Sequence, residues 1–222
     1  MADEPTEKVS YYAGLDLGQI GQFTGLALLE RHAKVTNHGF STTDAHYGVR
    51  HLQRFPPGTP YNEVLVSVRQ VFAEPGLKNG ELIVDQAAVG RAVYELIRNA
   101  EVSWGIRSVS ITAGHAAVMD DHGGWLVPKK DLVGVLQVLL QNRRIQVAPT
   151  LEHATTLVNE LSQFQLKTVS IKPDAAIEWR ERPHDDLVLA VAISAWHAEN
   201  DRPIVIEFIE IDRPPLPRWW RS

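Results

Sequence analysis

The sequence of 222 residues contains no cysteine, no long hydrophobic run and no excess of basic residues. The absence of cysteine excludes thiolate zinc sites, iron–sulfur clusters and cysteine nucleophiles, and it fits a reducing cytoplasm. The longest apolar stretch, residues 187–196, is shorter than the roughly 18 residues that a membrane-spanning helix needs. Residues 1–8 are acidic and polar, unlike a secretory signal. We therefore expect a cytoplasmic protein with no membrane segment.

The net charge is −5, so the overall composition gives no indication of nucleic-acid binding. Apolar residues make up 44% of the chain, which at this length is enough for a core without disulfides or a structural metal. We expect one domain at residues 10–202, after a disordered leader at residues 1–9. Residues 203–222 are expected to hold a further strand and a Pro/Trp-rich tail. Its end, residues 214–222, fits a docking segment for a partner and equally fits a tail folded back on its own domain.

The hydrophobic periodicity changes repeatedly between strand and helix. Three short β-type runs, at residues 11–17, 24–30 and 35–41, predict an antiparallel meander. After them, helices are predicted at residues 61–72, 89–100, 129–139, 151–164 and 185–199, with short strands at 81–85, 107–112 and 145–148. This order predicts an α/β domain with a mixed five-stranded sheet, its three antiparallel strands first, flanked by helices on both faces.

Aspartates occur in segments that are otherwise expected to be buried. Asp16 lies inside the apolar first strand, and Asp85 ends the apolar run at 82–85. Asp185 and Asp186 open the apolar last helix. A buried lone charge is unfavourable unless it is compensated. If the first and fourth strands are neighbours and the last helix packs across them, these acids meet at one end of the sheet, where oxygen ligands suit Mg²⁺ or Mn²⁺.

Each acid also has a structural explanation. Asp16 can accept hydrogen bonds from the amides of the turn at residues 18–21. Asp85 can cap the helix that follows it. Asp185 and Asp186 suit the positive end of a helix dipole. The argument for a metal site therefore depends on the acids occurring together.

A second group of polar residues lies in a glycine-bounded loop at residues 114–124. The group consists of His115, Asp120, Asp121 and His122. Its spacing matches no strong metal signature, so we expect a turn between two strands.

Four segments together resemble the nuclease domain of phage terminase large subunits, over about residues 11–198. They are Gly-Leu-Asp-Leu-Gly at 14–18 (followed by Thr-Gly at 24–25), Val-Asp-Gln-Ala-Ala-Val-Gly at 84–90, Val-Pro-Lys-Lys-Asp-Leu at 127–132 and His-Asp-Asp-Leu-Val at 184–188. That family has a ribonuclease H-like fold and cuts concatemeric viral DNA during genome packaging with acidic residues and two divalent metals. The resemblance implies Asp16, Asp85 and Asp186 as catalytic metal ligands, with Asp185 as a further ligand.

The resemblance also implies a cofactor and partners. Two Mg²⁺ or Mn²⁺ ions would serve such a site without a protein nucleophile. The substrate would be double-stranded DNA in a bacterial or phage-infected host cell, and the partners a separate ATPase motor, a portal or a small terminase subunit. Candidate phosphate contacts are Lys129, Lys130, Arg143, Arg144 and His184. Each of these also fits an ordinary solvated position at the end of a helix.

Three other functions fit the same residues. A Holliday-junction resolvase would share the fold and the metal chemistry. A non-catalytic DNA-binding or assembly module would keep the fold alone. The segment at 14–18 also resembles the start of a phosphate hairpin in actin-like ATPases and sugar kinases, but those folds need a second domain. Because these 222 residues contain no Gly-x-x-x-x-Gly-Lys-Ser/Thr loop, they carry no packaging motor of their own.

Overall fold

The computed structural model describes residues 6–19, 21–35, 45–77, 79–87, 90–99, 105–169 and 185–200. Its strands are β1 (Thr6–Asp16), β2 (Thr24–Val35), β3 (His46–Phe55), β4 (Glu81–Asp85), β5 (Gly105–Thr112), β6 (Val118–Met119), β7 (Trp125–Pro128) and β8 (Ile145–Val147). In the described residues they form one mixed sheet in the order β6-β7-β5-β4-β1-β2-β3-β8. Strands β1, β2 and β3 are antiparallel to their neighbours in this group, and β4, β5, β7 and β8 add in parallel.

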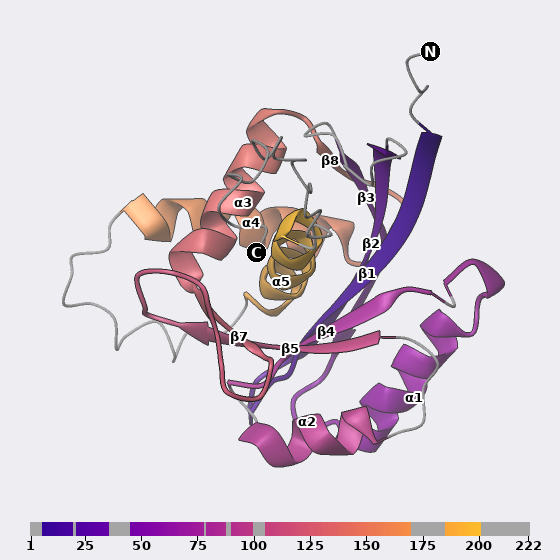
Figure 1. The fold of residues 1–222 in the computed structure, drawn as a ribbon, viewed down its shortest axis with the longest axis vertical. Coiled ribbons are helices and arrows are strands. Elements are labelled where there is room, and N and C mark those ends of the chain that lie inside the picture. Colours follow the sequence, from indigo (N-terminus) through magenta and orange to yellow (C-terminus); the bar gives the residue numbers. More distant parts are fainter. Residues whose placement is uncertain are drawn as a thin grey trace, which may run out of the picture.

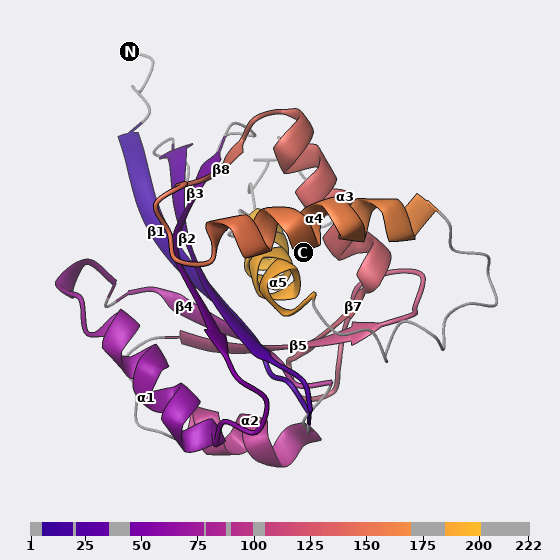
Figure 2. The same cartoon turned by 180° about the vertical axis from the view of Figure 1, so that it is seen from behind.

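Helices cover both faces of this sheet (Figure 1 and Figure 2). They are α1 (Tyr61–Phe72), α2 (Gly90–Arg98), α3 (Lys129–Gln141), α4 (Ala154–Val169) and α5 (Asp186–Asn200), with a short 3₁₀ turn η1 (Pro75–Leu77). Helices α1 and α2 lie on one face, and α3, α4 and α5 lie on the other. The helices therefore pack against the sheet through two apolar clusters, one on each face. The described helices include none that is long and apolar enough to cross a membrane.

The predicted α/β class, antiparallel beginning and two helical layers are confirmed, but the predicted count of five strands is wrong. The described part of the sheet has eight strands. Two of the additional strands, β6 and β7, have two and four residues. Strands this short contain too few residues to show a period of two, so the sequence pattern did not indicate them.

One predicted boundary at the start of the chain is also wrong. Residues 6–9, assigned to a disordered leader, belong to β1 and pair with β2 as far as Thr6 opposite Val35. The predicted third strand at residues 35–41 falls outside the described residues, except for Val35, which ends β2; the third described strand is β3. A bulge between Leu28 and Leu29 in the pairing of β2 with β3 breaks the alternation that would have indicated β3. The leader at residues 1–5, residues 36–44 and the tail at 203–222 lie outside the described residues.

Helix α5 is the central element of the layer that it shares with α3 and α4. Every residue from Asp186 to Ala198 is buried, which is typical of a helix enclosed on all sides. It packs across β1 and β2 on one side and against α3 on the other. Gly14 and Gly25 allow this close approach, because a Cβ at either position would collide with a backbone carbonyl oxygen of α5, at Ala190 and Asp186 respectively.

We expect Gly14→Ala to destabilise the protein, because its Cβ would force α5 away from β1. The expected loss is about 1–3 kcal/mol in the free energy of unfolding, measured by urea denaturation. Gly134→Ala is the matched control, because a Cβ there meets nothing within 4 Å in the middle of α3. That control should raise stability by about 0.5–1 kcal/mol, since alanine is the better helix former. Equal stability of the Gly14→Ala variant and the wild type would contradict the close contact.

Candidate metal centre

A row of residues at one end of the sheet brings the predicted acids together. Asp16 pairs in register with Asp85 of the parallel strand β4 on one side and with Gly25 of β2 on the other. Gly25 in turn pairs with Arg54 of β3. Neighbouring strands are about 4.8 Å apart, so four strands present Asp85, Asp16, Gly25 and Arg54 side by side. The start of α5 lies over this row, with the backbone of Asp186 against Gly25.

Strand alternation makes both acids face α5. Leu15 and Val84, the residues just before Asp16 and Asp85, belong to the apolar cluster with α1. Asp16 and Asp85 must therefore point to the opposite face, since successive side chains alternate. Two aspartates of neighbouring strands thus share one face of the sheet, at the same level, below the first turn of α5.

Asp85 is almost fully buried and is held by backbone amides. Its Oδ1 accepts a hydrogen bond of 2.9 Å from the amide of Ala87. Burial raises the pKa of Asp85 to about 6, although the amides of Ala87 and Ile111 oppose that rise. The structural explanation is correct in part, because Asp85 orders the turn after β4. However, α2 begins only at Gly90, so Asp85 does not cap it.

Asp16 is the electrostatic centre of the group. Burial raises its pKa well above the usual value, and the negative charges of Asp85, Asp185 and Asp186 raise it further, while Lys129 lowers it. The turn after Asp16 is held by other acceptors. Gly18 donates to Thr24 Oγ1 and Gln19 donates to Gln22 Oε1. These turn amides therefore do not explain the aspartate at this position.

The two aspartates at the start of α5 have different partners. Asp185 precedes the helix, and one of its oxygens accepts a 3.0 Å bond from Lys129 Nζ. Asp186, in the first helical turn, receives two bonds from Arg54, 2.9 Å from Nε to Oδ2 and 2.7 Å from Nη2 to Oδ1. The Asp186 side chain is 7% exposed and that of Asp185 is 27% exposed. Asp186 is thus the more enclosed of the two.

Sequence reasoning missed Glu160 and Arg54. Glu160 is a buried residue of α4, and its Oε2 accepts bonds of 3.1 Å from the amides of Leu187 and Val188. Burial, followed by the charge of Asp186, raises the pKa of Glu160 to about 7. A signal for Glu160 is present in the sequence, because it lies at helical spacing between the buried Leu157 and Phe164.

The predicted DNA contacts do not all lie near the acids. Lys129 lies near the acids, and Lys130 is exposed at the same end of α3. Arg143 and Arg144 follow the far end of α3, and Arg144 binds Glu199 and the carbonyl of Ala45. These two arginines are therefore outside the centre, since they follow the far end of the 13-residue helix that begins at Lys129. His184 lies outside the described residues.

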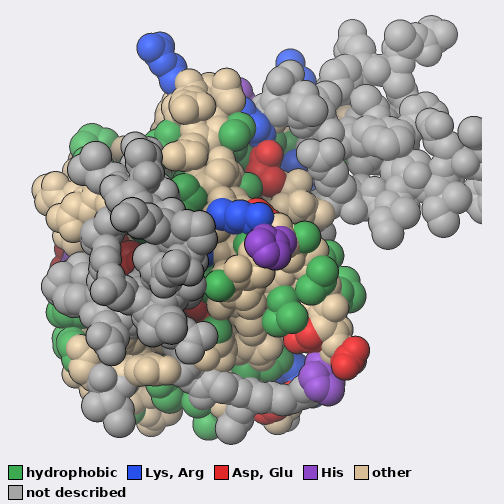
Figure 3. Space-filling view, turned by 90° about the vertical axis from the view of Figure 1, so that its left-hand side faces the viewer, with side chains coloured by type: hydrophobic (Ala, Val, Ile, Leu, Met, Phe, Trp, Pro, Cys, Tyr) green, Lys and Arg blue, Asp and Glu red, His purple; other side chains and the backbone are tan. Residues whose placement is uncertain are grey.

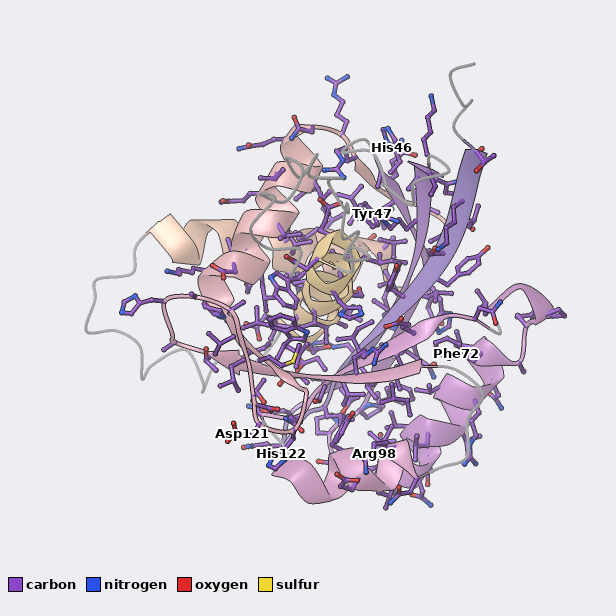
Figure 4. All side chains as sticks on the ribbon, viewed as in Figure 1. His46, Tyr47, Phe72, Arg98, Asp121 and His122 are labelled. Carbon is purple, nitrogen blue, oxygen red and sulfur yellow. The ribbon has the colours of Figure 1, made fainter. Side chains whose placement is uncertain are left out.

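The loop group at residues 114–124 forms a turn, as expected. Asp120 Oδ1 accepts bonds from the amides of His122 and Gly124, and Gly123 has a positive φ. Asp121 and His122 lie on this turn before β7 (Figure 4). Because Asp120 is used by the turn itself, the loop has a structural explanation.

The acids fit a hard divalent cation by their chemistry, because carboxylate oxygens are the ligands that such ions prefer. Oxygen donors gathered below a helix N-terminus repel one another, and a cation relieves that repulsion. In the described part of the chain, no three acid or histidine side chains are already arranged as a complete ligand set. Binding would therefore need small side-chain movements of Asp16, Asp85 and the acids of α5.

Together, the sheet order and the helical layers define a ribonuclease H-like fold. The chain resembles the large terminase nuclease of the thermophilic phage G20c in a magnesium-bound crystal structure, at TM-score 0.52 and 14% identity over 87% of this chain and 84% of that one. A second structure of the G20c nuclease gives TM-score 0.53 and 15% identity over 84% and 81%. T. thermophilus RuvC with a Holliday junction substrate reaches a TM-score of only 0.32 at 13% identity, over 85% and 93%, too low to indicate the same fold. No protein-family model and no curated protein sequence matches the chain.

We expect Asp16→Asn to stabilise the metal-free protein, because it removes one of several negative charges that repel one another. The gain should be about 1 kcal/mol, or about 2–4 °C in Tm for a chain of this size, measured in EDTA at pH 7.5. Asp131→Asn is the control, since Asp131 is a favourable first-turn charge of α3 and its loss should lower Tm slightly. A lower Tm for Asp16→Asn would show that the acids are already compensated without a cation.

Proposed function

We propose that the protein is a metal-dependent endonuclease that hydrolyses DNA phosphodiester bonds. The observation that carries the proposal is the register of β1 and β4, which sets Asp16 beside Asp85 below the acids of α5. Asp16, Asp85 and Asp186, with Asp185 beside it, would hold two Mg²⁺ or Mn²⁺ ions. A magnesium-bound terminase nuclease among the similar structures supports this choice of metal.

The residues of this chain would bind and orient the reacting groups. Bound cations supply an activated water and charge stabilisation for the leaving oxygen. Asp16 and Asp85 hold their positions through the sheet, and the amide of Ala87 fixes the Asp85 carboxylate. Lys129, released from Asp185, would contact the scissile phosphate as a point charge. No nucleophilic side chain is required, which agrees with the absence of cysteine.

Double-stranded DNA is the proposed substrate, and Lys129 and Lys130 are the proposed phosphate contacts. On the described part of the face in Figure 3, acidic, basic and histidine side chains are interspersed. Affinity would therefore come from a few contacts near the acids rather than from a wide basic surface, in keeping with the net charge of −5. A nuclease in this situation would benefit from a partner that delivers the DNA.

Genome packaging is the proposed setting, by analogy with the large terminase nuclease of phage G20c, which both similar structures contain. A separate ATPase motor, portal or small terminase subunit would then bring the DNA to this domain. The substrate and the setting are separate proposals, because cleavage of naked DNA requires none of these partners.

We expect the protein to nick or linearise supercoiled plasmid in Mg²⁺ or Mn²⁺, and not in EDTA. Asp16→Ala and Asp85→Ala should each reduce cleavage to the background, because each removes a proposed ligand from the centre. Asp131→Ala, an acid of α3 outside the centre, should cut like the wild type. Cleavage that survives in both active-site variants would come from a contaminant. DNA binding without any cleavage by the wild type would favour a non-catalytic module instead.

We expect Lys129→Met to separate metal binding from catalysis. Lys129 competes with a cation for Asp185, so its removal should leave Mn²⁺ affinity equal or higher in calorimetric titration. Cleavage at saturating Mn²⁺ should nevertheless fall by about tenfold or more, as expected for a lost charged contact of about 1.4 kcal/mol or more. Lys130→Met should change cleavage less. Weaker Mn²⁺ binding by Lys129→Met would mean that Lys129 organises the acids instead of competing for them.

A further inference from the structure

Side chains from two elements, Arg54 of β3 and Glu160 of α4, hold the start of α5. Arg54 of β3 donates from two nitrogens to both oxygens of Asp186, the fork geometry that makes arginine–carboxylate pairs strong and directional. Glu160 of α4 accepts the first amides of the helix, at Leu187 and Val188. The first turn of α5 is thus fixed both through a side chain and through its backbone.

The guanidinium of Arg54 has little freedom to move. It lies 3.9 Å from the ring centroid of Phe23 and contacts two acids, with Nη2 2.7 Å from Asp186 Oδ1 and 3.6 Å from Glu160 Oε1. The Glu160 side chain is 4% exposed, and in the described residues its Oε1 has no hydrogen-bond partner. Removing Arg54 would therefore leave two buried carboxylates facing each other without a cation between them.

We propose that Asp186 is an anchor held by Arg54 and Glu160, and that Asp185 is the α5 carboxylate that completes the metal centre. This inference rests on the proposed function and reverses the order of the two acids that the family resemblance implies. Both oxygens of Asp186 accept bonds from one guanidinium, whereas Asp185 is more exposed and shares one oxygen with Lys129. Arg54 and Glu160 are then positioning residues, because they act through α5 and not on the metal.

The first experiment compares Mn²⁺ binding, by calorimetric titration, of the full-length wild type, Asp185→Asn and Asp186→Asn. We expect Asp185→Asn to weaken binding by at least about tenfold with a Tm close to that of the wild type. Asp186→Asn should lower the Tm by several degrees, because Arg54 loses the carboxylate that binds both of its nitrogens, and should keep more of the Mn²⁺ affinity than Asp185→Asn. Affinity lost equally or more strongly in Asp186→Asn would overturn the proposal.

Arg54 provides a test that does not depend on the stability of Asp186→Asn. If Asp186 is an anchor, Arg54→Met misplaces the start of α5, and the Mn²⁺ concentration for half-maximal cleavage should rise by about tenfold. If Asp186 is instead a ligand, Arg54 competes with the metal, and its removal should lower that concentration. Arg54→Lys keeps the charge without the fork and should give an intermediate value.

Arg50→Met is the matched control for these variants. Arg50 lies on the same strand as Arg54 and also binds a carboxylate through two nitrogens, those of the pair with Glu30, but it is exposed and outside the centre. Its metal dependence should equal that of the wild type. A wild type that binds no Mn²⁺ and cuts no DNA would contradict the proposed function itself, whereas an active wild type with unchanged metal dependence in Arg54→Met would contradict only the anchor.

Discussion

The close contact of α5 with β1 and β2 is the constraint on which the candidate centre depends. Backbone can meet backbone here only because Gly14 and Gly25 carry no Cβ. A second consequence follows from the position of Gly25 between Asp16 and Arg54 in the row across the sheet. The missing side chain opens the place that Asp186 takes, so the same glycine that allows packing also brings the acids of α5 next to Asp16.

Charged side chains of both signs surround this contact. Moving from β4 to β3, the acids Asp85 and Asp16 are followed by the glycine gap and then by Arg54, with Lys129 above Asp185. The positive N-terminal end of α5 points at the same place, and such an end favours anions. Part of the negative charge is therefore compensated by the protein, while burial, followed by the charges of Asp85, Asp185 and Asp186, still raises the pKa of Asp16. A centre with this residual charge is suited to take up cations.

The acids could be found from the sequence because each interrupts an apolar segment. Asp16 follows the buried residues 12–15 of β1, Asp85 follows the buried residues 82–84 of β4, and the pair at 185–186 opens an apolar helix. Their grouping was expected on the condition that the first and fourth strands are neighbours, as β1 and β4 are, since parallel strands end at the same edge of a sheet. The roles of the two α5 acids did not follow, because they are set by Arg54, whose strand the periodicity did not predict, since the bulge in β3 interrupts its alternation. Contacts made across the sheet leave no trace in local periodicity.

Glu160 shows a different limit of prediction from the local sequence. A glutamate on the apolar face of α4 indicates a buried partner, but local sequence cannot show that the partners are the amides of Leu187 and Val188. An acid that caps another helix needs only to reach its N-terminus, and many positions satisfy that condition. Burial and the nearby charge of Asp186 make an ionised Glu160 unfavourable. The positive charge of Arg54, 3.6 Å from Glu160 Oε1, compensates part of this cost. The requirement for a cation between these two acids explains why an arginine, with its fixed fork and permanent charge, occupies this position in β3.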